Sequence, residues 1–68
     1  MIIPNLPQEH LNNIELLVVE FGEVHRKGIL TRYLNQFYIS EEDPVLKNRK
    51  LSKHVYNRTK EALKIEYL

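Results

Sequence analysis

The spacing of apolar residues predicts helices along most of the chain. Between Gln8 and Tyr38 they recur at the three- and four-residue intervals of an amphipathic helix, but in two phases. The first phase comprises Ile14, Leu17, Val18, Phe21 and Val24, and the second comprises Leu30, Tyr33, Leu34 and Phe37. The phases lie about 150° apart around a helix, so one straight helix would be apolar on both sides. We therefore predict a bend between Gly22 and Gly28, where Lys27-Gly28 resembles a helix C-terminus.

A β-strand over residues 14–21 is a competing interpretation, because this stretch contains β-branched residues. The region offers only one obvious strand and no visible partner strand, and an isolated strand is not stable. The pattern therefore favours an all-α fold.

A polar turn at 39–43 precedes the last segment. Asp43 followed by Pro44 is typical of an N-cap and a first helical position, which predicts a helix over 44–67. An irregular 44–51 followed by a helix that starts at Ser52 is the alternative. The predicted apolar stripe consists of Leu51, Val55, Ala62 and Ile65, with Thr59 beside it.

We expect one small domain. Pro4 and Pro7 predict an extended N-terminal arm over 1–7, and 8–68 then forms a single helical domain, either a helical hairpin or a three-helix unit. A chain of 68 residues buries only about 60% of its unfolded surface, so its own core is marginal. The chain contains no cysteine to form disulfides. We therefore predict a homodimer, or docking onto a larger partner.

Charge is distributed unevenly. Residues 1–43 carry a net charge of −4 and residues 44–68 a net charge of +5, so the total of +1 conceals a bipolar chain. The basic residues lie mainly opposite the apolar stripe and predict a surface that binds phosphates or an acidic protein. A solvated helix face remains the alternative. The predicted contact residues are Lys47, Arg49, Lys50, Lys53, Tyr56, Asn57, Lys60 and Lys64.

Aromatic residues gather near the end of the second phase. Tyr33, Phe37 and Tyr38 are candidates for a protein interface, since tyrosine combines apolar area with a polar tip. Closure of the core is the alternative interpretation, and it is favoured for Phe37.

Catalytic and metal-binding patterns are sparse. His10, His25 and His54 are too far apart in sequence for a helical ligand pair, so we predict surface or partly buried histidines and no metal or cofactor. The acids Glu41-Glu42-Asp43 could bind a cation, but we expect them instead to stabilise the start of a helix through its dipole.

The segment Arg49-Lys50-Leu51-Ser52-Lys53-His54-Val55-Tyr56 fits the pattern Arg-x4-His-x-Tyr. This is similar to the active motif of HEPN-type ribonucleases. The resemblance implies His54 as general base and Arg49 on the developing phosphorane charge. It covers eight residues, and the asparagine usual after the arginine is Lys50 here. The two side chains would converge only if the helix began near Ser52.

The main prediction is a small non-enzymatic regulator or adaptor that binds a larger protein. A nucleic-acid-binding regulator using residues 47–64 is the second, and a ribonuclease the third. No apolar run approaches a membrane span, and Met1-Ile2-Ile3-Pro4 is too short for a signal peptide. We therefore expect a cytoplasmic protein.

Overall fold

The computed structural model describes residues 5–46 and 50–67. Within them the chain forms helix α1 (Gln8–Phe21), a 3-10 turn η1 (Glu23–His25), helix α2 (Arg26–Glu41) and helix α3 (Leu51–Tyr67). These ranges contain no β-strand, so the all-α prediction is confirmed and the strand over 14–21 is wrong. The predicted contact residues Lys47 and Arg49, and the first four residues of the predicted arm, lie outside the described ranges.

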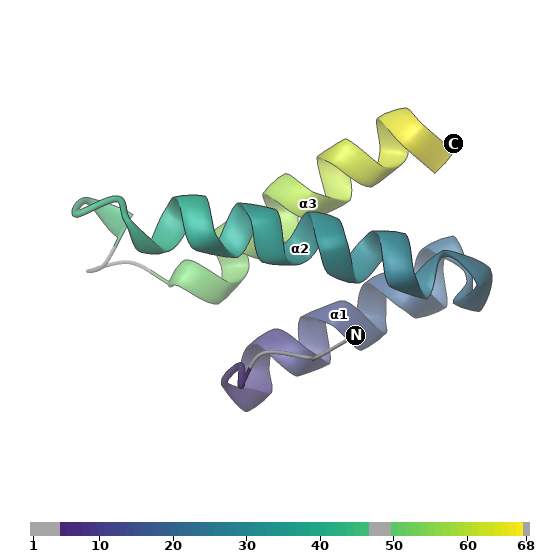
Figure 1. Ribbon diagram of the computed structural model, residues 1–68, viewed down its shortest axis with the longest axis horizontal. Helices are drawn as coiled ribbons and strands as arrows, with labels where there is room; N and C mark the ends of the chain where they lie inside the picture. The colour runs from purple at the N-terminus through teal and green to yellow at the C-terminus, as the bar shows by residue number, and fades with distance from the viewer. Residues whose placement is uncertain (1–4, 47–49, 68) are drawn as a thin grey trace.

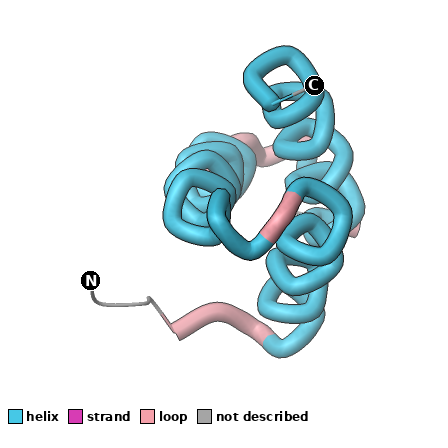
Figure 2. Tube along the Cα trace, turned by 90° about the vertical axis from the view of Figure 1, so that its right-hand side faces the viewer, coloured by secondary structure: helices cyan, strands magenta, loops and turns pink. Residues whose placement is uncertain are grey.

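The three helices form two layers. Helix α2 makes up one layer, and α1 and α3 lie together in the other (Figures 1 and 2). The Cα positions extend 34 × 25 × 16 Å. One face of α2 therefore looks outward without a covering element, and α3 packs against both other helices.

The turn between α1 and α2 depends on Gly22. Its backbone has φ 113° and ψ 142°, which side-chain-bearing residues rarely adopt, and its N–H donates to the Val18 carbonyl at 2.8 Å. Arg26 then closes the turn, because its guanidinium donates to the carboxylates of Glu15 (2.5 and 3.0 Å) and Glu23 (2.7 and 2.9 Å). The predicted break between the two apolar phases is confirmed at this glycine.

Gly28 has a different role from the predicted helix terminus. It lies inside α2, where the Tyr67 side chain of α3 approaches its backbone. A Cβ at this position would overlap the Tyr67 hydroxyl. The glycine therefore permits the end of α3 to pack closely on the beginning of α2.

Helix α3 begins at Leu51, so the predicted helix start at Pro44 is wrong and the alternative start at Ser52 is close to the observed one. The Asp43 carboxylate accepts the Val45 N–H at 2.9 Å and so stabilises a turn after α2 instead of capping a helix. The turn predicted at 39–43 begins three residues later, at Glu42, because α2 continues to Glu41.

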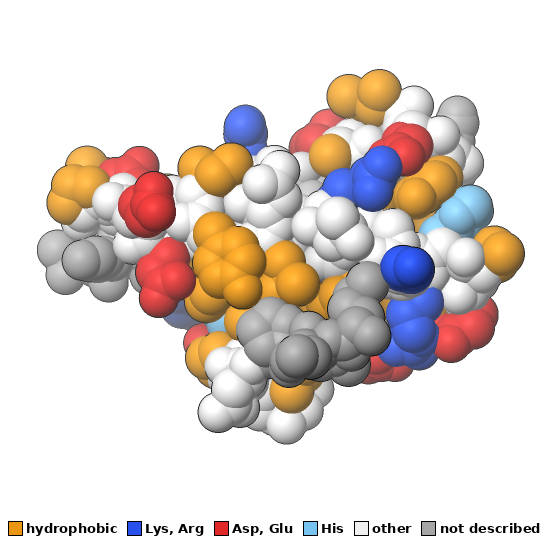
Figure 3. Space-filling view, viewed as in Figure 1, with side chains coloured by type: hydrophobic (Ala, Val, Ile, Leu, Met, Phe, Trp, Pro, Cys, Tyr) orange, Lys and Arg blue, Asp and Glu red, His pale blue; other side chains and the backbone are white. Residues whose placement is uncertain are grey.

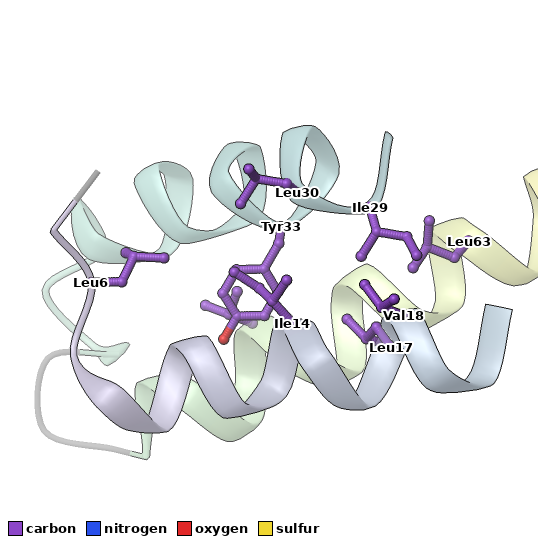
Figure 4. Packing of buried hydrophobic residues seen from close by; sticks show 9 residues of the cluster. Leu6, Ile14, Leu17, Val18, Ile29, Leu30, Tyr33 and Leu63 are labelled. Atoms are coloured by element: carbon purple, nitrogen blue, oxygen red, sulfur yellow. The ribbon is translucent and has the colours of Figure 1, made fainter. Parts of the chain in front are cut away.

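The buried apolar side chains form one cluster that draws on all three helices (Figure 4). Tyr33 lies at its centre and has no exposed surface, and Leu6 joins the cluster from the segment that precedes α1. The members are Leu6, Ile14, Leu17, Val18, Ile29, Leu30, Tyr33, Val55 and Leu63.

Two predicted core positions are exposed. Val24 and Ile65 each keep 88% of their surface accessible. The buried line of α3 runs through Val55, Thr59 and Leu63, at four-residue intervals, because this side of the helix packs against both α1 and α2. Thr59 satisfies its hydroxyl by donating to the Val55 carbonyl at 2.7 Å.

Candidate binding surface

Helix α3 gathers basic side chains along its outward side. We define the basic ridge as Lys50, Lys53, Asn57, Lys60 and Lys64, which recur at three- and four-residue intervals and therefore share one side of the helix. Over these positions the ridge is about 21 Å long at 1.5 Å per residue. Lys60 is half-buried and the other four residues are exposed.

Most of the charge on this ridge is unpaired. Lys60 Nζ lies 3.2 Å from Glu20 of α1, and this hydrogen bond raises the pKa of Lys60. Lys60 also stands over the half-buried Tyr56 ring, 5.8 Å from its centroid. Lys50, Lys53 and Lys64 have no ion pair with any described residue. The ridge therefore presents three uncompensated cations.

Acidic residues of α1 border the ridge on one side. The Ser52 hydroxyl donates to Glu9 at 3.2 Å at the beginning of α3, and Glu20 holds Lys60 further along. Glu61 is exposed on α3 itself. The surface around the ridge therefore alternates in sign and is not uniformly basic.

A buried polar network fixes α3 against the other two helices. The Tyr33 hydroxyl lies 2.7 Å from His10 Nδ1 and accepts a hydrogen bond from Asn13 Nδ2 at 3.0 Å. The same Asn13 amino group donates to the Ser52 carbonyl at 3.0 Å. The Tyr33 oxygen therefore accepts from Asn13 and forms a second hydrogen bond with His10 Nδ1, in which the tautomer of the imidazole decides which group donates.

This network corrects the prediction for the histidines. His10 is buried, with 2% of its surface exposed, and burial lowers its pKa. Burial likewise raises the pKa of Tyr33 to about 12. The sequence offered one signal for this network, since His10 and Asn13 share a helix face with Leu17, but nothing in it indicated Tyr33 as their partner.

The end of α3 is anchored to the beginning of α2. The Glu66 carboxylate accepts two hydrogen bonds from the Arg32 guanidinium. The Tyr67 ring stacks on His25, with centroids 3.9 Å apart and planes at 21°. These contacts and the buried network hold both ends of the ridge in place relative to α1 and α2.

The three aromatic residues predicted at an interface have different surroundings. Tyr33 is fully buried within the single chain and offers no surface to a partner. Phe37 is half-buried and packs edge-on against His10, at 5.0 Å between centroids. Tyr38 keeps 50% of its surface exposed. Of the three, Tyr38 is therefore the one placed to contact another molecule.

Metal binding and the HEPN-like pair are the two other chemistries that the titratable side chains could support. No group of three histidine, aspartate or glutamate residues in the described ranges is arranged to hold a metal ion. His54 is half-buried on α3, three residues after the helix begins, whereas Arg49 lies outside the described residues. Of the two residues that resemble the HEPN motif, the structure therefore describes only His54.

None of the helices in residues 5–46 and 50–67 combines the length and apolar character needed to cross a bilayer. Comparisons with protein families, with curated proteins and with solved structures find no match to this chain.

Proposed function

We propose that this chain is a non-enzymatic regulatory or adaptor protein of the cytoplasm, which acts as a homodimer and binds a larger protein through the basic ridge. The observation that carries this proposal is a row of three lysines, Lys50 directly before α3 and Lys53 and Lys64 on it, which have no ion pair with any described residue. The helix itself is anchored near both ends. Fixed cations of this kind favour an anionic partner and accelerate its encounter.

The acids beside the ridge favour a protein over a nucleic acid. A helix in the major groove lies between two phosphate strands, so the elements that flank it also meet phosphates. Here the flank is formed by α1 with Glu9 and Glu20, and Glu61 lies on the exposed surface of α3 itself. These carboxylates would repel a phosphate backbone, whereas a narrow acidic groove on a protein could receive the ridge alone.

Nucleic acid is the second candidate. Asn57 is exposed in the middle of the ridge, where an amide could read an adenine edge, and the lysines on either side could neutralise phosphates. The half-buried Tyr56 is covered by Lys60, which leaves less of its ring for stacking on a base.

The test removes one ridge charge at a time. Lys53→Gln and Lys64→Gln are compared with Arg58→Gln, which removes an equal charge from an exposed position of α3 outside the ridge. A protein captured by the wild-type chain is purified, and its association rate is measured with each variant at low and physiological salt. We expect both ridge variants to slow association and weaken its salt dependence, and Arg58→Gln to change neither.

A 20-base-pair duplex and a single-stranded RNA of matching length are measured in parallel. Retention of either at physiological salt, with a salt slope that falls by about one unit per lysine removed, would establish the nucleic-acid alternative. If Lys53→Gln, Lys64→Gln and Arg58→Gln all associate at the wild-type rate, the ridge is excluded as the contact surface.

A further inference from the structure

The outer face of α2 is covered by no other described element. We define this face as Lys27, Thr31, Leu34, Asn35, Tyr38 and Glu42, which follow one side of the helix and its C-terminal turn. All are exposed except Leu34, which is half-buried. Thr31, Leu34, Asn35 and Tyr38 also line a shallow hollow in the surface, together with Arg32.

The charges of this face that lack an ion pair to a described residue lie at its two ends. Lys27 lies in the first turn of α2, and Glu41 and Glu42 lie at its C-terminus, whereas Arg32 beside the hollow is paired with Glu66. Figure 3 shows this face, with acidic side chains at the end where α2 terminates, basic and acidic side chains together at the other end, and apolar and uncharged polar ones between. The acids beside the α2 N-terminus are held by Arg26, so Lys27 at one end and the glutamates at the other end carry charges of opposite sign.

This polarity is unfavourable for an isolated α2. The helix dipole favours anions near the N-terminus and cations near the C-terminus, and α2 has neither an acid in its first turn nor a base in its last. Lys27, Glu41 and Glu42 also have no ion pair with any described residue. A second molecule that supplied the opposite charges would make this arrangement favourable.

We infer that the outer face of α2 binds the same face of a second copy of this chain, with the two helices antiparallel. This inference rests on the homodimer of the proposed function and assigns its interface. A two-fold axis between Leu34 and Asn35 places Lys27 opposite Glu42 of the second copy and Thr31 opposite Tyr38 of the second copy. The contact is isologous, so each favourable pair occurs twice.

The pairing corrects both helix ends at once. Each N-terminus gains the carboxylates of the other copy, and each C-terminus gains its lysine, which satisfies both the ion pairs and the helix dipoles. At the centre, the exposed half of Tyr38 can enter the shallow hollow beside Thr31 of the second copy. Tyrosine is among the residues enriched at the centres of such contacts.

The dimer leaves the basic ridge available. The outer face of α2 and the ridge of α3 belong to different layers (Figures 1 and 2). A dimer therefore displays two ridges, and a partner with two acidic sites would bind it more tightly than one copy through effective concentration. The interface thus supports the adaptor function without competing for its surface.

Charge reversal tests the pairing and its register. Lys27→Glu and Glu42→Lys each place like charges opposite each other at both ends of the dimer, and the double variant restores attraction. Each single change improves the match between α2 and its own dipole, so loss of the dimer cannot be attributed to loss of the helix. The mass of each protein is measured by sedimentation equilibrium at micromolar concentration, and helix content by circular dichroism.

We expect about twice the monomer mass of 8.1 kDa for the wild type and the double variant, and the monomer mass for each single variant. Asn35→Glu should also give a monomer, because it brings two carboxylates together at the two-fold axis. Asn12→Glu, the same change on an exposed position of α1, should leave the dimer intact.

A wild-type dimer that persists in both single variants would overturn this interface and leave the proposed homodimer standing. A double variant that remains monomeric would refute the antiparallel register. A wild-type monomer at these concentrations would refute both the interface and the homodimer.

Discussion

The Tyr33 hydroxyl is the most consequential single polar group in the core. It forms a hydrogen bond with His10 Nδ1 and accepts another from Asn13, and its side chain has no exposed surface. Tyr33→Phe keeps the ring and removes these two hydrogen bonds. His10 Nδ1 then remains buried without a hydrogen-bond partner, whereas Asn13 retains the Ser52 carbonyl.

The magnitude follows from those contacts. A hydrogen bond contributes about 1 kcal/mol net, and a buried acceptor left without a partner costs about 1–3 kcal/mol. We therefore expect Tyr33→Phe to lower the free energy of unfolding by about 2–3 kcal/mol. A domain of this size is stabilised by only about 3–10 kcal/mol, so the loss is a large fraction of the total.

Urea unfolding followed by circular dichroism at neutral pH and fixed protein concentration measures this difference. Tyr56→Phe is the matched control, because its side chain is half-buried, lies outside the outer face of α2, and its hydroxyl makes no hydrogen bond to a described residue. The reasoning is refuted if the two variants unfold at the same urea concentration with equal slopes.

Three further predictions concern pH and the two glycines. Burial holds the pKa of His10 below its usual 6.5, with Glu9 opposing the shift, so the unfolded chain binds the proton first as pH falls. The contribution of neutral His10 to the free energy of unfolding should therefore be complete above pH 6.5 and be lost as pH decreases through the folded-state pKa. His10→Gln should remove this pH dependence from the urea unfolding profile. Gly22→Ala should cost about 1–3 kcal/mol in urea unfolding, because φ is 113° there, and a cost near zero would contradict this. Gly28→Ala should be more favourable in a Tyr67→Phe background than alone, since the tyrosine hydroxyl occupies the space of the new Cβ; equal effects in the two backgrounds would show that this approach is not restrictive.

The apolar pattern was sufficient for the fold class and for most of the core. Ile14, Leu17, Val18 and Leu30 lie where their periodicity placed them, and the change of phase located the turn near Gly22. Both features depend on local geometry, which residue spacing records directly.

The errors arose where two packing partners compete for one helix. Helix α3 contacts α1 and α2 together, so its buried line runs through Leu63 and leaves Ile65 exposed. The spacing of apolar residues alone does not reveal the direction of a second neighbour. Asp43 likewise is a residue type that suits both a helix N-cap and a turn. Only the path of the chain that follows decides between the two, and here Asp43 accepts the Val45 N–H in a turn.

The candidate surface was partly foreseeable. Helical spacing places Lys53, Asn57 and Lys64 on one outward side, as the structure has them. The salt bridge between Lys60 and Glu20 was not, because it joins residues forty positions apart whose proximity depends on the tertiary packing of α1 and α3. The Glu20 carboxylate is one of the groups that favour a protein over a nucleic acid as the partner.

One amide group has a consequence for how the molecule unfolds. Both hydrogens of the Asn13 amino group are used, one on Tyr33 of α2 and the other on the Ser52 carbonyl of α3, so a single side chain of α1 joins all three helices. Detaching α3 would leave this donor unsatisfied and expose Val55 and Leu63 together. Partial opening is therefore disfavoured, and native-state hydrogen exchange should show the buried amides of the three helices exchanging as one cooperative unit.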